Sequence, residues 1–412
     1  MACGRNMPVP EKVLRIRRKD REMNYIELKD RIFAEIEKYR AELTALNDDI
    51  ADHPEISGEE YETSKKIVAL LRSHGYQVEY PFAGRDTAFK AISGGNDHKY
   101  KVAILTEYDA LPEIGHACGH CLSGSISILA GLATKELQDE LDTDIHIVGT
   151  PVEETDGAKC QMVADGVFDE YDMAIMVHLY NGNLLTPKLQ GLASYMYCFH
   201  GKAAHASAAP WDGRNAFNAA QLMFHAIDML RQHSRQDAQF HGIIRSGGEA
   251  PNIVPEEVTA EVYIRALDKK YLQELIQKVD DCARGAAIAT QTTWDKYATA
   301  AVYDNMKPNP TGIAALAEIY DELGLALNGD PDEIFGSSDA GNVSFVCPGF
   351  HPCLQVTEPD TPIHTRGFAE AMKTDLAHDR LVDGAKIIAL QIAKIFSDEE
   401  KIAAMKADFE NN

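Results

Sequence analysis

The stretch Val102 to His120, VAILTEYDALPEIGHACGH, decides both the fold class and the place where we expect chemistry. Its first four residues are apolar and precede Thr106, a pattern that predicts a short buried strand. Acidic, imidazole and thiol side chains then follow within one turn-rich segment: Glu107, Asp109, His116, Cys118 and His120. Such groups are costly to bury unless they bind something, and ligands of open α/β sheets lie at the carboxyl ends of strands. The simplest interpretation is a metal site at this edge of a sheet.

Helix and strand patterns alternate on both sides of this stretch. Helices are expected at 32–46, from the turn HPEISGEE (53–60) to about 73, and at about 122–137. Strands are expected at 75–80, 100–105, 145–150 and 172–179, the last ending at His178. The alternation predicts an α/β fold in which a mixed, largely parallel sheet carries helices on both faces.

The pattern changes near Gly191. From there to Tyr303 the signals follow the order strand, helix, strand, strand, helix, strand. The strand segments are ASYMYCFHGKA, HGIIRSG, VTAEVYIRA and TTWDKYATAAV, and apolar residues at helical spacing mark 216–230 and 272–286. This order predicts a self-contained ferredoxin-like α+β module inserted into the first domain, whose alternation resumes after Tyr303.

Length and composition restrict the possible partners and compartments. A chain of 412 residues is too long for one ordinary core. Its net charge of -24 argues against nucleic acids and anionic membranes as partners, and no apolar run approaches the roughly 20 residues that span a bilayer. Eight scattered cysteines without a secretory signal favour a reducing, cytoplasmic location. The first 21 residues carry seven basic and two acidic groups but no apolar core, so we expect residues 1–22 to form a disordered leader.

Residues able to bind a metal follow three separate predicted strands. Cys118 and His120 follow the first, the pair Glu153-Glu154 follows the second, and His178 ends the third. A lone histidine is more often structural, but a parallel sheet brings such strand ends together. A thiolate and a carboxylate would offset the charge of divalent ions, and neutral imidazoles would complete their coordination. Of two adjacent carboxylates, one can bind metal while the other accepts a proton from metal-activated water.

The segment CGHC, residues 118–121, permits a different interpretation. It resembles the active site of protein disulfide isomerases, which need an activated thiolate at a helix start and a second cysteine one turn later. That family places an aromatic-rich strand and a tryptophan before its motif, whereas His116 and Ala117 precede this one. A structural zinc site would need a second CxxC or a histidine pair at standard spacing, and neither is present. Metal-assisted hydrolysis is therefore the favoured interpretation.

Taken in order, several motifs resemble the aminoacylase/carboxypeptidase family of metallopeptidases, peptidase family M20. They are EYDALPEIGHACGH, GTPVEETDGAK, MVH, HGKAAHAS, APNIVP, SSDAGNVS and PIHT. The nearest branch is the amidohydrolase one, which includes p-aminobenzoyl-glutamate hydrolases and dipeptidase-like members. Together with HPEISGEE, these motifs cover nearly the whole chain.

The resemblance implies two divalent metal ions per subunit, which could be zinc, manganese, cobalt or nickel. It makes Cys118 a bridging thiolate and Glu153 the general base, with Asp109 orienting a ligand from behind. The other implied ligands are His120, Glu154, His178 and His364. The chain departs from the family at Cys121, where relatives usually have Asp or Asn.

The resemblance also implies a homodimer. His205 would reach into the partner subunit's active site and stabilise the oxyanion of a small amide substrate. Asn252 and Arg265 would hold the substrate's carboxylate, and Asn342, within SSDAGNVS, would also contact substrate. Without this resemblance, His205 would be interpreted as an ordinary histidine at the edge of a strand.

These expectations combine into one hypothesis. The catalytic α/β domain comprises about 23–190 and 306–412, with a lid and dimerisation domain at 191–305. The enzyme would hydrolyse the amide bond of an N-acyl amino acid, an aminobenzoyl-glutamate-like compound or a dipeptide. The alternative is a catalytically silent homologue that binds metal or amino-acid derivatives. A pure binder would not need the free base Glu153 beside a complete ligand set, which favours the enzyme.

Overall fold

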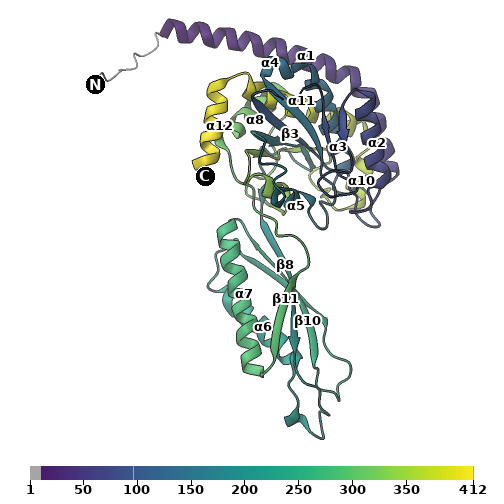
Figure 1. Ribbon diagram of the computed structural model, residues 1–412, viewed down its shortest axis with the longest axis vertical. Helices are drawn as coiled ribbons and strands as arrows, with labels where there is room; N and C mark the ends of the chain where they lie inside the picture. Colours follow the sequence, from purple (N-terminus) through teal and green to yellow (C-terminus); the bar gives the residue numbers. More distant parts are fainter. Residues whose placement is uncertain (1–10, 96, 412) are drawn as a thin grey trace, which may run out of the picture.

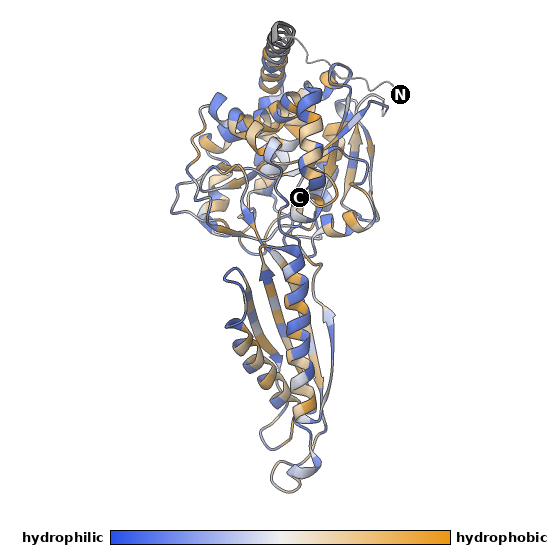
Figure 2. Ribbon diagram, turned by 90° about the vertical axis from the view of Figure 1, so that its left-hand side faces the viewer, coloured by the Kyte–Doolittle hydropathy of each residue, from blue (hydrophilic) through white to orange (hydrophobic). Residues whose placement is uncertain are grey.

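The computed structural model describes residues 11–95 and 97–411 and shows two parts (Figure 1). A rounded α/β domain contains both described ends of the chain. A second unit, whose strands run from Gly191 to Ala298 and which is called the lid below, extends from it as a narrow arm (Figures 1 and 2). Throughout the described ranges, every helix is either too short or too polar to cross a membrane.

A six-stranded sheet forms the centre of the α/β domain. Its order is β1-β2-β4-β3-β5-β13; β1, β2 and β4 pair antiparallel, while β4, β3, β5 and β13 pair in parallel. The strands are β1 (Gln77–Glu79), β2 (Phe89–Ile92), β3 (Tyr100–Thr106), β4 (Thr143–Gly149), β5 (Met173–Ile175) and β13 (Gly349–Phe350). Two small parallel pairs flank it: β6 (His178–Tyr180) with β14 (Cys353–Gln355), and β7 (Lys188–Leu189) with β12 (Ile334–Gly336).

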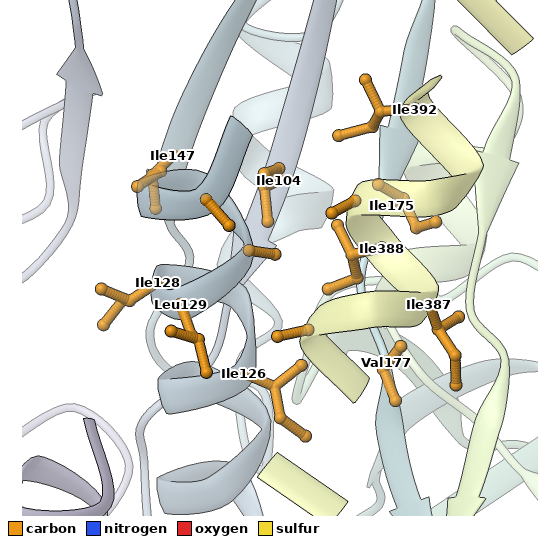
Figure 3. Packing of buried hydrophobic residues seen from close by; sticks show 14 of the residues in the cluster. Ile104, Ile126, Ile128, Leu129, Ile147, Ile175, Val177, Ile387, Ile388 and Ile392 are labelled. Atoms are coloured by element: carbon orange, nitrogen blue, oxygen red, sulfur yellow. The ribbon is translucent and has the colours of Figure 1, made fainter. Parts of the chain in front are cut away.

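Helices cover both faces of this sheet. The longer ones are α1 (Glu11–Asp52), α2 (Tyr61–Ser73), α3 (His120–Thr134), α8 (Pro310–Glu322), α11 (Asp375–Phe396) and α12 (Glu399–Asn411). The shorter ones are η1 (Lys135–Leu137), α4 (Gln138–Leu141), α5 (Ala158–Ala164), α9 (Ala340–Val343) and α10 (Arg366–Ala371). Buried side chains of α3 and α11 interlock beside the strand residues Ile104 and Ile175 (Figure 3).

The side chains of β3 contribute alternately to two hydrophobic cores on opposite faces of the sheet. Val102 and Ile104 belong to the larger core with α1, α3 and α11, whereas Ala103 and Leu105 belong to a second core with α5 and α9. Alternate residues of a strand point to opposite faces, so a strand covered on both sides is apolar throughout. The predicted fold class, a mixed and largely parallel sheet between helical layers, is confirmed.

The lid has its own sheet and its own core. Its strands are β8 (Gly191–His200), β9 (Gln239–Ser246), β10 (Glu257–Ala266) and β11 (Thr293–Ala298); its helices are η2 (Pro210–Asp212), α6 (Ala216–Arg231) and α7 (Lys269–Thr290). All neighbours in the order β11-β8-β10-β9 are antiparallel. This is the ferredoxin-like arrangement that the sequence predicted.

The chain enters and leaves the lid at one point. Leu192 and Tyr303 exchange two backbone hydrogen bonds, each 2.9 Å from nitrogen to oxygen. The two crossing segments therefore lie side by side as a short antiparallel hinge.

Two sequence predictions need correction, and two strands of the central sheet were not predicted. The stretch 11–22, expected to belong to a disordered leader, is helical and continues into α1, while residues 1–10 lie outside the described residues. No glycine or proline interrupts Glu11–Asp52, so nothing in that run ends a helix. The strand predicted at 172–179 is two strands, because a uniformly buried run does not show where the chain changes partner; His178 begins β6 rather than ending a strand. Strands β2 and β13 were not predicted; they are four and two residues long, too short to show a clear alternation.

Candidate active site

A cavity of about 450 Å³ lies where the lid joins the α/β domain. The α/β domain contributes Cys118, Glu153, Glu154, His178, Ser337, His351 and His364 among others, and the lid and hinge contribute Leu192, Ser194, Tyr263, Arg265 and Tyr303. Ligand sites are common at such domain junctions and at the carboxyl ends of parallel strands.

A tight turn at the start of α3 brings Cys118 to the cavity and holds the fully buried His120 with its ligand atom within 4.8 Å of the thiol. Gly119, between them, has φ +89°, and a Cβ there would lie 3.1 Å from Leu179 and 3.3 Å from the sulfur of Met372. Glycine is therefore required for both backbone conformation and space. Asp109 Oδ1 lies 2.9 Å from His120 Nδ1, which assigns the proton to that nitrogen and leaves Nε2 able to bind a metal.

The turn after β4 presents the two glutamates. Asp109 also accepts the backbone N–H of Glu154 at 3.0 Å, and Tyr303 donates its hydroxyl to the carbonyl of Glu153 at 2.9 Å. One carboxylate thus orients both a histidine and the glutamate turn, in the positioning role that the sequence assigned to Asp109. Burial, together with the carboxylates of Glu107 and Asp339, raises the pKa of Glu153 well above its usual range.

The predicted ligands form two groups that share Cys118. One contains Cys118, His120 and His178, and the other contains Cys118, Glu154 and His364; within each group the ligand atoms lie within 4.8 Å of one another. Cys118 Sγ is 3.5 Å from His178 Nε2, and Glu154 Oε2 is 3.7 Å from His364 Nε2. The five side chains predicted as ligands lie together around Cys118; four of them line the cavity, and His120 is buried beside them.

The donors at this end fit divalent metal ions. The sites offer a thiol, imidazoles and a carboxylate, the donor types that zinc and similar ions prefer. Glu154 Oε1 is buried and has no hydrogen-bond partner among the described residues. Such an oxygen is costly to desolvate unless a cation binds it. Burial raises the pKa of the Cys118 thiol well above its usual range, so a cation is needed to stabilise the thiolate.

A buried ion network behind Glu153 was not predicted from the sequence. Lys159 Nζ lies 2.7 Å from Glu107 Oε1 and 2.6 Å from Asp339 Oδ1, and all three side chains are fully buried. Burial raises the pKa of Glu107, but Lys159 and then His120 oppose this and hold it at about 2. The only sequence signal was a lysine placed among apolar residues of α5, which a surface position explains equally well.

His351 was also missed by the sequence analysis. It lines the cavity, is buried, and stacks on His178 with ring centroids 5.1 Å apart and planes at 22°. Burial lowers the pKa of His351 to about 4, so its ring is neutral at physiological pH. Its position after β13 could have suggested a site residue, because other site residues also follow strands.

Arg265 is the cation of the cavity. It extends from the end of β10 and donates to Ser337 Oγ at 2.8 Å, and it pairs with no carboxylate within the described ranges. Asn342, predicted to contact substrate, does not line the cavity. Its side chain accepts the N–H of Asp304 at 2.9 Å and donates to the carbonyl of Val302 at 3.0 Å, so its polar atoms are committed to the hinge.

His205 and Asn252 lie on the two loops at the far end of the lid, one after β8 and the other between β9 and β10, and these loops pair through His205 and Ile253. The backbone of Ala206 donates to the carbonyl of Asn252 at 3.0 Å, which joins the two loops that form the tip. Residues near the start of β8 line the cavity, and the tip follows its end; ten residues of strand separate them by roughly 30 Å. The exposed His205 therefore cannot reach the cavity of its own chain in this conformation.

The hinge cavity brings two ligand groups that share one thiol together with the carboxyl of Glu153, which also lies among other acidic and imidazole donors; this is the arrangement of a metallohydrolase site. Residues 188–290 match the family model described as a peptidase dimerisation domain. Xaa-Arg dipeptidase of Mus musculus is 33% identical over 403 residues, which cover 93% of this chain and 92% of that protein. One component of the p-aminobenzoyl-glutamate hydrolase of Escherichia coli is 28% identical, with 88% of this chain and 91% of that protein covered.

Solved structures share the fold at low sequence identity. A putative aminohydrolase from Staphylococcus aureus superposes with a TM-score of 0.76 at 18% identity, covering 89% of this chain and 99% of that one. A Bacillus subtilis structure, described as a dinuclear metal-binding peptidase of the M20 family, gives 0.67 at 19% identity, with 87% and 99% covered. This chain belongs to the M20 family of metallopeptidases, and it is a hydrolase of amide bonds.

Proposed function

We propose that this enzyme cleaves the amide bond of an N-acyl amino acid, an aminobenzoyl-glutamate-like compound or a dipeptide, with two divalent ions at Cys118. The observation that carries the proposal is the membership of Cys118 in both ligand groups, because one thiolate between two sets of donors suits a pair of ions. Among zinc, manganese, cobalt and nickel, zinc suits the thiolate, zinc and nickel suit the imidazoles, and manganese suits the carboxylate. Ions bound there would supply Lewis acidity, which polarises a carbonyl group and lowers the pKa of water.

Glu153 moves the proton in this proposal. Its carboxylate lines the cavity and is not needed to complete either group around Cys118. It would accept a proton from the attacking water and pass it to the leaving amine, a role that suits a carboxyl whose pKa is raised. Asp109 would keep His120 and the glutamate turn in place during this transfer.

Arg265 would hold a carboxylate of the substrate. Half-buried guanidinium groups usually pair with carboxylates, and Arg265 has only the neutral hydroxyl of Ser337 among the described side chains. A substrate with a free carboxylate at the amine side of its scissile bond would fill this gap. Such a group is present in all three substrate classes considered.

The tip of the lid would act on a second subunit. His205 is exposed and lies roughly 30 Å from the cavity of its own chain, and the match to a dimerisation domain covers this lid. In a homodimer, His205 would stabilise the oxyanion in the partner's cavity, with Asn252 nearby to contact the substrate's carboxylate. The seven cysteines in the described ranges are free thiols, which supports a cytoplasmic location.

A substrate panel tests the proposal. Purified protein is supplied with manganese, zinc, cobalt or nickel and offered acyl amino acids, aminobenzoyl-glutamate and dipeptides, with released amine as the readout. Glu153→Gln should lower turnover by roughly 10²–10⁴-fold while metal content stays unchanged. Loss of metal together with turnover would make Glu153 a ligand, and absence of cleavage across the panel would favour the silent binder.

A further inference from the structure

The segment HPEISGEE, residues 53–60, forms hydrogen bonds with elements of the active site but lies outside the cavity. Its backbone pairs with Ala110, next to the aspartate that orients His120: Ala110 N donates to the carbonyl of Glu55 at 2.9 Å, and Ser57 N donates to that of Ala110 at 3.2 Å. None of its residues lines the cavity. The segment therefore touches the elements that carry the site without touching substrate.

Glu60 is the last residue of this segment. Its side chain is fully buried, and Oε1 accepts the backbone N–H of Val152 at 3.1 Å and that of Gly58 at 2.8 Å. The other oxygen, Oε2, accepts the hydroxyl of Thr87 at 3.1 Å. No lysine, arginine or histidine forms an ion pair with Glu60 within the described ranges. The free energy cost of burying this carboxylate is therefore offset by the hydrogen bonds that it accepts.

Val152 occupies an unusual backbone conformation directly before Glu153. Its φ is +63°, in the left-handed region that β-branched residues almost never adopt. Such outliers persist only where surrounding contacts hold them, and they cluster at functional sites. The contacts of Asp109 and Tyr303 act later in the turn, at Glu154 N and Glu153 O, so the described contact at the strained residue's N–H comes from Glu60.

We propose that Glu60 is a positioning residue for proton transfer: it holds Val152 in the left-handed conformation and thereby sets the orientation of the Glu153 side chain. The inference rests on the proposed role of Glu153 as the proton carrier. Glu60 contacts neither substrate nor the ligand groups, and its effect passes through one backbone N–H. Displacements of about 1 Å in a reacting group can cost roughly 100-fold in rate, so a loose turn would be visible in kcat.

Three substitutions at Glu60 separate positioning from general stability. Glu60→Ala removes the acceptor and should lower kcat by roughly 10- to 100-fold while KM and metal content stay unchanged. Glu60→Gln retains an amide oxygen for Val152 N and should keep most of kcat. If the alanine variant does not fold, Glu60→Asp carries the same test, because its shorter side chain withdraws the acceptor from Val152.

A second-site substitution tests the strain directly. Glycine adopts the left-handed conformation without the steric cost that valine meets. In a Val152→Gly background, Glu60→Ala should therefore lose much less of kcat than it does alone, on the order of tenfold less. Thr87→Val is the matched control, since it removes the hydrogen bond to Oε2 of Glu60 and leaves Val152 N and Gly58 N bound to Oε1. This control should lower the melting temperature slightly and leave kcat unchanged.

Two results would overturn the proposal: full kcat in a folded Glu60→Ala protein, or an equal loss of kcat with valine and with glycine at 152. The second would mean that Glu60 supports the fold without acting through Val152. Full turnover by Glu153→Gln is a separate result, since it would refute the proposed function whatever the Glu60 variants do.

Discussion

Replacing Lys159 with methionine tests the buried ion network behind Glu153. Methionine preserves most of the side-chain volume but removes the charge, which leaves Glu107 and Asp339 fully buried without the ammonium that lies 2.7 and 2.6 Å from them. Breaking a buried pair by removing one partner costs about 3–5 kcal/mol, because the remaining charge stays desolvated. Since domains are stable by only about 5–15 kcal/mol, we expect a large loss.

The assay is urea unfolding of the metal-free protein in the presence of a chelator, because bound metal would add its own stabilisation. Lys188→Met is the matched control. Lys188 pairs with Asp332 at the surface, where both side chains are well exposed, and such pairs contribute about 0–1 kcal/mol. Adding Asp339→Asn to Lys159→Met should recover part of the loss, since one buried charge then disappears.

The pKa of Lys159 lies above its usual value, because the attraction of Asp339 and Glu107 outweighs the opposing effect of burial. A raised pKa in the folded state means that the stabilisation is fully present below the pKa of an unfolded lysine, about 10.4, and is lost as pH rises toward the folded value. The effect of Lys159→Met should therefore be largest near pH 9 and smaller near pH 6, because burial raises the pKa of Asp339 to about 6 and a protonated carboxyl leaves no buried charge without its partner. A loss within 1 kcal/mol of the Lys188→Met control at pH 7 would refute this reasoning.

Three further predictions concern the cavity. Cys118→Ser should lose metal and activity whereas Cys121→Ser keeps most of both, as measured by metal analysis and turnover; equal behaviour would revive the CxxC interpretation. Refolding the His205→Ala and Glu153→Gln variants together should restore about a quarter of wild-type activity. About half of the dimers are then mixed, and each mixed dimer has one intact site of two. A mixture no more active than the mean of its two parents would exclude the role of His205 in the partner's site. Arg265→Gln should raise KM for substrates with a free carboxylate by roughly 10- to 100-fold and affect their amidated analogues little, which parallel KM measurements check.

The sequence predicted the elements that have strong periodic signals. The ferredoxin-like order of the lid and the apolar run of β3 both follow from spacing alone, because a core imposes a regular pattern on the residues that face it. Motifs also predicted which side chains would meet at Cys118. The structure places them on α3, on the turn after β4, on β6 and on a loop, so no local pattern could have joined them.

The sequence could not predict features that arise from contacts between distant segments. Lys159 meets Glu107 and Asp339 across 52 and 180 residues of chain. Glu107 was expected near the site, but Lys159 resembles a surface residue when considered alone. Asn342, which was predicted to contact substrate, shows the same dependence on contacts between distant segments. Its motif lies in the right region, but the side chain is committed to the hinge backbone, which only the three-dimensional arrangement reveals.

The paired hinge at Leu192 and Tyr303 has a consequence for how the chain folds. These residues are 111 apart in sequence yet hydrogen-bonded to each other, so an unfolded lid would be a very long loop within the α/β domain. Once the lid has folded, the same connection behaves like a tight turn of about four residues, which reduces the closure entropy by about 3 kcal/mol. The two halves of the α/β domain should therefore find each other faster when the lid has folded first, and a destabilised lid should slow folding of a domain whose own residues are unchanged.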